Sequence, residues 1–394
     1  MSDEHYDVVV VGGGIHGVGV AQAAAAAGYS VLVLEQTALA SGTSSRSSKL
    51  IHGGLRYLES AQFALVRECL HERELLLKLA PELVQRRRFY IPVYRHTSRR
   101  PWQIRAGLSL YATLSGMSSS ATFRTIPRQS WTELDGLRTD GLQTVFQYWD
   151  AQTDDAELTK AVMQSAVELG ARLCAPAVFR SATLTDNGCD IAYEDAGQTK
   201  SCRAKVVINA AGPWVNSVLG NFHPHQTGLD VDLVQGAHIL LNGQVTHGIY
   251  YMEAPSDRRA VFVMPWKSRV LVGTTETGFH NDPADVHALE SEVQYLLETL
   301  RFYFPVYKNT TSKDVVSEFA GLRVLLAGNQ LAFKRPRETV LHVDRSLAPK
   351  LLTIYGGKLT AYRATARKVM QRIDRSLPER RAVADTARLP LKPA

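Results

Sequence analysis

Hydrophobic positions near the N-terminus follow the pattern of a parallel βαβ unit. Residues 6–11 end in four consecutive valines, which is typical of a strand buried on both faces. An alanine-rich segment at 21–27 predicts a helix, and residues 30–34 predict a second buried strand. This order of elements favours an α/β fold built on a parallel sheet.

Later segments predict further helices and a second kind of sheet. Helices are predicted at 62–80, 154–169, 286–303 and 359–376. Short strands are predicted from 172 to 209, and residues 228–280 alternate as an antiparallel sheet would. Residues 315–326 and 351–355 predict two more strands. We therefore expect a Rossmann-like domain, interrupted in sequence, and a second domain on an antiparallel sheet.

A glycine fingerprint joins the first strand to the first helix. Gly12, Gly14 and Gly17 form a GxGxxG motif. The first glycine permits a tight turn, the second lets backbone amides approach a pyrophosphate, and the third lets helix and strand pack closely. Glu35 ends the second strand, where a carboxylate can accept hydrogen bonds from ribose hydroxyls and disfavours the 2′-phosphate of NADP. The unit predicts a dinucleotide site.

A second glycine turn opens a helix far downstream. The strand at 351–355 stops at Gly356-Gly357-Lys358. An NAD-binding domain has no obvious use for this turn, whereas a long cofactor such as FAD needs contacts at its flavin end. Two-electron reduction leaves negative charge near flavin N1 and the C2 oxygen, which Lys358 and a helix N-terminus would stabilise. The alternative is a plain β-to-α turn.

Residues 41–59 combine hydroxyls, cations, His52 and a diglycine, a composition that suits close approach to an anionic ligand. Such runs are more often solvated surface loops. This run follows the complete fingerprint, so a bound dinucleotide could extend past it.

Cationic side chains recur near predicted strand ends and turns. They are Arg56, Arg323, Arg337 and Lys358. Together they could form a fork for a phosphate, with each charge-assisted bond contributing about 1.5–3 kcal/mol. His238 lies in an apolar alternating strand, so it is either a satisfied core residue or a general base with an ordinary pKa of about 6.5. His52 is the competing candidate.

Composition narrows the class of partner. The chain has 394 residues, of which 45% are hydrophobic and 21% charged, enough for two packed domains. Its net charge of +7 favours anionic partners, although no zinc or RNA-binding pattern supports nucleic acid and we expect no metal site.

Four cysteines without a CxxC pair indicate a reducing compartment. The short segment before the first strand predicts no signal peptide, and no apolar run is long enough to span a membrane. We expect a cytoplasmic protein.

The most basic stretch lies within residues 86–116, where arginines alternate with aromatic residues. Pro101 suits the first turn of a helix, and Ile104, Leu108 and Tyr111 recur at helical spacing. This apolar stripe predicts either an interfacial helix resting on anionic lipid or a helix whose stripe faces the core. The sequence leaves both open.

Five motifs, in order along the chain, resemble the FAD-dependent glycerol-3-phosphate dehydrogenase family. They are VGGGIHG at 11–17, SSRSSKLIHGGLRYL at 44–58, NAAGPW at 209–214, GTT at 273–275 and YGGKLTAYR at 355–363. The resemblance runs from about residue 6 to 375. The second motif is highly specific to the family.

The resemblance implies noncovalently bound FAD, oxidation of sn-glycerol 3-phosphate at C2 to dihydroxyacetone phosphate, and transfer of electrons to membrane quinone. It implies an α/β (α+β overall) fold. A discontinuous Rossmann-like FAD-binding domain would take residues 1–85, 150–220 and 340–394, and a substrate domain on an antiparallel sheet would take 86–149 and 221–339. The protein would be cytoplasmic or peripheral on the inner face of the cell membrane, in contact through 86–116.

The resemblance also assigns residues. Catalytic or substrate-binding residues would be His238, Arg323, Lys358, Arg56, Tyr57 and Arg337, with Arg335 as a stand-in for Arg337. FAD would be held by Gly12, Gly14, Gly17, Glu35, Thr43, Ser44, Ser48, Val178, Gly212 and Leu359.

Two departures from the family pattern bear on these expectations. The family commonly continues into a helical C-terminal domain, whereas this sequence stops at Ala394, and Pro255 stands where a polar residue is expected. Two alternatives therefore stay open. One is an enzyme of the same fold that uses O₂ or acts on another small hydroxy acid or amine. The other is a flavin-binding protein without turnover.

Overall fold

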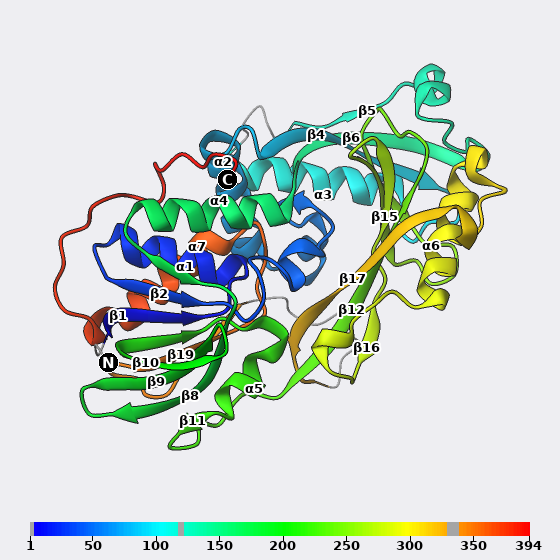
Figure 1. The fold of residues 1–394 in the computed structure, drawn as a ribbon. Helices are drawn as coiled ribbons and strands as arrows, with labels where there is room; N and C mark the ends of the chain where they lie inside the picture. Colours follow the sequence, from blue (N-terminus) through cyan, green and yellow to red (C-terminus); the bar gives the residue numbers. More distant parts are fainter. Residues whose placement is uncertain (1–3, 117–121, 329–338) are drawn as a thin grey trace.

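The structure, a computed structural model, describes residues 4–116, 122–328 and 339–394. Two β-sheets form its two halves (Figure 1). The first sheet carries the N-terminal strands and the second carries the middle of the chain. Arg335 and Arg337, expected at the substrate site, lie outside the described residues.

The first sheet contains nine strands among the described residues. They are β1 (Glu4–Val11), β2 (Val31–Leu34), β7 (Arg172–Cys174), β8 (Ala177–Thr185), β9 (Gly188–Asp195), β10 (Gln198–Asn209), β11 (Phe222–His223), β18 (Val340–Val343) and β19 (Leu351–Tyr355). Strand β1 pairs in parallel with β10 and β2, and β10 pairs in parallel with β19. The valines of β1 and all of β2 are buried, as the continuous apolar runs predict.

The second sheet contains ten strands of the described chain. They are β3 (Leu50–Ile51), β4 (Val84–Tyr94), β5 (Arg124–Thr125), β6 (Leu142–Thr153), β12 (Val231–Leu241), β13 (Ile249–Glu253), β14 (Ala260–Trp266), β15 (Arg269–Gly273), β16 (Thr277–Phe279) and β17 (Val315–Leu326). Its longest pairings, β12 with β17 and β4 with β6, are antiparallel. The mixed α/β fold predicted from the sequence is confirmed.

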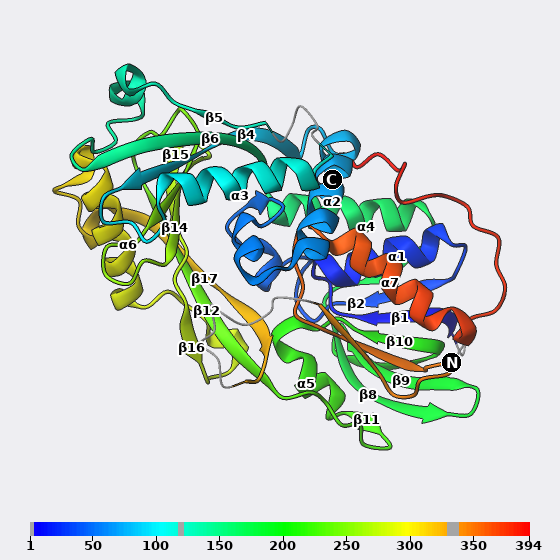
Figure 2. The same cartoon turned by 180° about the vertical axis from the view of Figure 1, so that it is seen from behind.

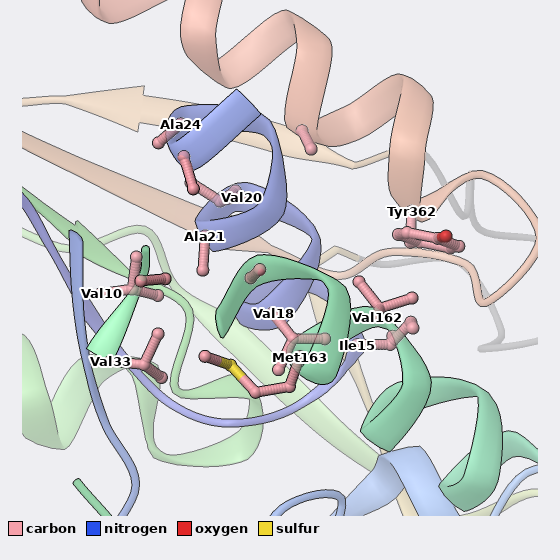
Figure 3. Packing of buried hydrophobic residues seen from close by; sticks show 14 of the residues in the cluster. Val10, Ile15, Val18, Val20, Ala21, Ala24, Val33, Val162, Met163 and Tyr362 are labelled. Carbon is pink, nitrogen blue, oxygen red and sulfur yellow. The ribbon is translucent and has the colours of Figure 1, made fainter. Parts of the chain in front are cut away.

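The helices cover the sheets and fill the space between them. They are α1 (Ile15–Ala26), α2 (Phe63–Leu79), α3 (Pro101–Leu114), α4 (Asp155–Glu168), α5 (Val215–Leu219), α6 (Glu290–Tyr303) and α7 (Tyr362–Ile373). Helices α1, α4 and α7 lie together on one face of the first sheet (Figures 1 and 2). Their contact surface is apolar: Val18 of α1, Met163 of α4 and Tyr362 of α7 belong to one buried cluster with Val10 and Val33 (Figure 3).

Helix α3 settles the orientation of the apolar stripe. Ile104, Leu108 and Tyr111 are 9%, 1% and 1% exposed and pack with residues of α2, β4 and β6. Of the two orientations left open, the stripe therefore faces the protein core, and a stripe facing lipid is wrong, because the second sheet offers these side chains a surface. The opposite face is exposed at Trp102 and Leu110.

The expected domain borders cut two strands of the second sheet. The border after residue 85 falls inside β4, and the border before residue 150 falls inside β6. These two strands pair along their whole length, so a border within them would divide one antiparallel ladder. The division into domains stays a prediction.

Gly17→Ala tests the close packing of α1 on the sheet. A Cβ at this position would lie 1.9 Å from the carbonyl oxygen of Gly12, so the helix would have to move. We expect a loss of about 1–3 kcal/mol in the free energy of unfolding, measured by urea denaturation. Gly107→Ala is the matched control in α3, where the new methyl group meets nothing within 4 Å. It should be neutral or stabilise by about 0.5–1 kcal/mol, and equal losses in both variants would contradict the account.

Candidate active site

One cavity of about 790 Å³ is lined by residues from both sheets. Fourteen of the residues predicted from the sequence lie in its wall: Gly12, Gly14, Glu35, Thr43, Ser44, Ser48, Arg56, Tyr57, Val178, Gly212, His238, Arg323, Lys358 and Leu359. Gly17 lies behind the wall, where it packs against Gly12. Residues far apart in sequence therefore meet at one site.

The fingerprint forms one end of the cavity. Gly12 has φ +113°, and a Cβ there would lie 2.6 Å from the carbonyl oxygen of Ala210. Helix α1 begins directly after Gly14, so its N-terminus lies at this end of the cavity, where an anion is favoured. The hydroxyl of Ser44 already accepts the Ile15 amide at 2.9 Å, which places the 43–45 turn beside the fingerprint.

Glu35 braces the same turn. Its carboxylate accepts the amide of Gly13 at 2.7 Å and the amide and hydroxyl of Thr37 at 2.9 and 3.1 Å. A carboxylate has about four acceptor positions, so it can still receive a ribose hydroxyl from the cavity. The predicted role of Glu35 therefore fits its place in the wall.

The second glycine turn lies against the first. Gly356 and Gly357 have φ +69° and +128°, and a Cβ on Gly357 would lie 1.9 Å from His16 Nε2. His16, in the first turn of α1, was missed from the sequence, although its place inside the fingerprint was a signal. Burial lowers the pKa of His16 to about 4, so the imidazole is neutral at pH 7.

These features fit a long dinucleotide. The cavity runs from a glycine turn with a helix N-terminus at 12–15 to a second glycine turn with Lys358 at 356–359, and Val178 lies in the wall beside Glu35. A Cβ on Gly12 or on Gly357 would collide with neighbouring atoms, so the backbone itself forms the cradle. FAD is the cofactor whose length and two ends match this wall.

His238 marks the other part of the cavity. It lies on β12, 2% exposed, with Nε2 2.9 Å from the Ser48 hydroxyl and its ring stacked on Phe319 at 4.8 Å. Burial, and then the charges of Arg323 and Lys49, lower its pKa to about 3. The imidazole is therefore neutral over the physiological range, further below the ordinary value of about 6.5 than the sequence suggested.

Three of the predicted cations line the same cavity as this histidine. Arg323, on β17, donates to Thr274 Oγ1 at 3.1 Å and lies 3.5 Å from a carboxylate oxygen of Glu276. The Lys358 ammonium lies 4.1 Å from the ring centroid of Tyr57. Arg56 precedes Tyr57 in the 3₁₀ turn Leu55–Ser60 and lines the same cavity.

The remaining candidates are placed as follows. His52 also lines the cavity, so it stays an alternative to His238 as the general base. Its backbone amide donates to Thr360 Oγ1 at 3.1 Å. Within the described residues, no three His, Cys, Asp or Glu side chains are grouped as metal ligands. No helix in the same ranges is both long and apolar enough to cross a bilayer.

A buried ion pair behind the site was not predicted. Lys49 Nζ lies 2.6 Å from Asp155 Oδ1, and the two side chains are 6% and 0% exposed. The Lys49 ammonium also lies 5.0 Å from the ring centroid of Phe319, the ring on which His238 stacks. Burial raises the pKa of Asp155, and Lys49 opposes that rise. No spacing in the sequence connects residues 49 and 155, so the pair could not be found there.

Comparison with known proteins shows the family to which the chain belongs. Residues 7–363 match a family described as FAD dependent oxidoreductase. D-erythritol 1-phosphate dehydrogenase of Brucella abortus is 36% identical over 382 residues, which cover 95% of this chain and 75% of that protein. Glycerol-3-phosphate dehydrogenase of Pseudomonas aeruginosa is 38% identical over 375 residues, which cover 94% of this chain and 72% of that protein.

A solved structure gives the same result. Glycerol-3-phosphate dehydrogenase from Bacillus halodurans, complexed with FAD, superimposes with a TM-score of 0.76 at 26% identity, covering 99% of this chain and 68% of that one. The chain therefore belongs to the FAD dependent oxidoreductase family. The particular resemblance to FAD-dependent glycerol-3-phosphate dehydrogenases is confirmed by these relatives, and FAD is the cofactor.

His16→Asn tests the buried neutral imidazole at the fingerprint. Because the pKa of His16 is about 4 in the folded protein and about 6.5 when unfolded, the unfolded state takes up a proton first as the pH falls. Stability is therefore complete above about pH 6.5 and is lost as the pH falls toward 4. Between pH 7.5 and 5 the wild-type holoprotein should lose about 2 kcal/mol more than the variant in urea denaturation. Equal losses would show that His16 is not buried as a neutral group.

Proposed function

We propose that the chain oxidises sn-glycerol 3-phosphate at C2 to dihydroxyacetone phosphate and passes the electrons to a membrane quinone. The observation that carries the proposal is the meeting, at one cavity, of three cations with a buried neutral imidazole. The cations are Arg56, Arg323 and Lys358, and the imidazole is His238. The cations would bind a phosphate, and the neutral imidazole would accept the proton of the alcohol that is oxidised.

The cations supply the phosphate site. Guanidinium groups match the geometry of phosphate oxygens, and charge-assisted bonds to a phosphate are stronger in a cavity that excludes water. Arg323 is already held by Thr274 and Glu276, so little side-chain freedom is lost when a ligand binds. Arg337 belongs to the same proposal but lies outside the described residues.

His238 supplies the proton acceptor. In the proposed step the C2 hydroxyl proton goes to the neutral imidazole while the C2–H bond breaks and its electron pair leaves as hydride, so that C2 becomes a carbonyl. Bound FAD supplies the hydride acceptor at N5. Ser48, 2.9 Å from Nε2, orients the ring, and Lys358 with the N-terminus of α7 would stabilise the negative charge of the reduced flavin. An anionic substrate beside Arg323 would also raise the basicity of His238.

The relatives support a sugar-alcohol phosphate as the substrate. One is described as a glycerol-3-phosphate dehydrogenase and another as a D-erythritol 1-phosphate dehydrogenase. Both described substrates carry a phosphate and hydroxyl groups, so the same cations and base would serve either. Three alternatives predict other outcomes of flavin reduction by substrate. They are an oxidase that uses O₂, an enzyme for another hydroxy acid or amine, and a flavin-binding protein without turnover.

Anaerobic mixing of the purified holoprotein with sn-glycerol 3-phosphate tests the proposal. We expect bleaching of the oxidised flavin absorbance. Arg323→Ala should weaken substrate binding by about 1.5–3 kcal/mol, or roughly ten- to a hundredfold in the substrate concentration for half-maximal bleaching. Because His238 is already neutral, the limiting rate should stay flat from pH 8 to pH 6.

Four results would redirect the proposal. Bleaching only by D-erythritol 1-phosphate would change the substrate, and bleaching only by hydroxy acids or amines would remove the phosphate fork. Rapid hydrogen peroxide production in air would favour O₂ as acceptor. No bleaching by any of them would favour the protein without turnover.

The outer face of α3 is where we place the approach of the quinone. The cavity wall reaches Gln103, Gly107 and Leu110 of this helix. Trp102, in the first turn of the helix, is 70% exposed. Exposed apolar side chains on a helix that lines a redox cavity, within the arginine-rich stretch 86–116, suit a lipid-soluble acceptor and an anionic bilayer. We therefore propose a cytoplasmic protein that binds the inner face of the membrane peripherally through residues 86–116. The contact would be made by the exposed face of α3, opposite the buried apolar stripe.

Trp102→Ala tests this surface. Removing one interfacial tryptophan should weaken binding to anionic vesicles by about tenfold and slow quinone-dependent reoxidation on them, while anaerobic reduction by substrate stays unchanged. Val306→Ala is the control, because Val306 is 72% exposed but lies in the 3₁₀ turn Pro305–Tyr307, away from the cavity wall. If both variants bind vesicles equally well, α3 is not the contact surface.

A further inference from the structure

The diglycine at Gly53-Gly54 is held by a buried tyrosine from α3. The Gly53 amide donates a hydrogen bond to the Tyr111 hydroxyl at 2.7 Å. Tyr111 is the last residue of the apolar stripe and is 1% exposed. Beyond Gly53, only Gly54 and Leu55 precede Arg56 and Tyr57, which line the cavity.

The tyrosine is itself held by a buried ion pair. Its hydroxyl donates to Asp150 Oδ2 at 2.8 Å, and Asp150 Oδ1 lies 2.5 Å from Arg73 Nη1. Asp150 and Arg73 are 2% and 1% exposed. Burial, followed by the nearby Asp150 charge, raises the pKa of Tyr111 well above its usual value, so the hydroxyl stays protonated. Because its proton goes to the carboxylate, its oxygen is free to accept the Gly53 amide.

The packing leaves Gly53 little freedom. A Cβ there would lie 2.6 Å from the Tyr111 oxygen and 2.7 Å from Leu70 side-chain atoms, so the backbone sits directly on these two residues. The preceding amide, that of His52, donates to Thr360 Oγ1 at 3.1 Å, close to Lys358 in sequence. Two consecutive amides are thus fixed to side chains from α3 and from the second glycine turn.

We propose that Tyr111 is a positioning residue: through the Gly53 amide, and backed by Asp150 and Arg73, it fixes the diglycine so that Arg56 and Tyr57 meet the phosphate-bearing substrate. This inference rests on the proposed function. In this proposal Tyr111 contacts neither the substrate nor FAD, because it acts through the backbone of the 44–58 motif.

Tyr111→Phe in the FAD-loaded protein is the test, since it removes one oxygen and keeps the ring that packs in the core. We expect the sn-glycerol 3-phosphate concentration for half-maximal anaerobic flavin reduction to rise about five- to tenfold, with the limiting rate within about twofold. Tyr303→Phe is the matched control: Tyr303 is 1% exposed and donates to the Glu253 carbonyl at 2.7 Å, outside the cavity wall. It should leave both quantities unchanged.

An Arg56→Ala background separates positioning from general loosening of the fold. If Tyr111 acts through the placement of Arg56, adding Tyr111→Phe to Arg56→Ala should change substrate binding little further. Fully additive losses would overturn the proposal, and so would a Tyr111→Phe protein that binds substrate like Tyr303→Phe.

Amide hydrogen exchange keeps the inference distinct from the proposed function. Tyr111→Phe should speed exchange of the 52–57 segment in the FAD-loaded protein, and Tyr303→Phe should not. If sn-glycerol 3-phosphate fails to reduce the wild-type flavin, the proposed function fails, and faster exchange limited to 52–57 still supports the positioning. Unchanged exchange in that segment would refute it.

Discussion

Positive charge gathered at an enclosed cavity is the constraint on which the rest of this structure depends. Arg323 and Lys49 lie close enough to the buried His238 to lower its pKa, and Lys358 lines the same cavity. Like charges in a low-dielectric site repel strongly. The protein offsets part of this charge internally: Asp155 pairs with Lys49, and Glu276 lies 3.5 Å from Arg323. An anionic substrate would offset more of it. Burial, and then the charges of Arg323 and Lys49, lower the pKa of His238 and keep it unprotonated, which is the state that a base requires.

Holding these charges in place requires buried polar contacts that reach across the molecule. The 44–58 motif supplies Ser48 and Arg56 from one loop, and other elements fix that loop at several points. Asp155, in the first turn of α4, pairs with Lys49, and Tyr111 of α3 accepts the Gly53 amide. Buried ion pairs add little net stability, but removing one partner is costly, so they specify one arrangement of the loop. Helix α3 thereby connects the site to the surface, since its other face borders the cavity mouth.

Much of the fold and part of the site follow from the sequence. The valine run, the fingerprint and Glu35 predicted the βαβ unit, because each residue type there has a local steric or electrostatic reason. The stripe of α3 could not be oriented, since the surface that buries Leu108 comes from β4 and β6 and from α2. Lys49–Asp155 and Tyr111–Asp150 were missed for the same reason: they join residues 106 and 39 positions apart, and no local pattern records such contacts. The pKa of His238 departs from its ordinary value because burial and two distant cations act on it together.

The most direct test of the central claim is a crystal structure of the reduced holoprotein with dihydroxyacetone phosphate bound. We expect the phosphate within hydrogen-bond distance of the Arg323 guanidinium and the C2 carbonyl oxygen within hydrogen-bond distance of a ring nitrogen of His238. A phosphate bound away from these cations, or a carbonyl facing His52 instead of His238, would contradict the assignment of the site.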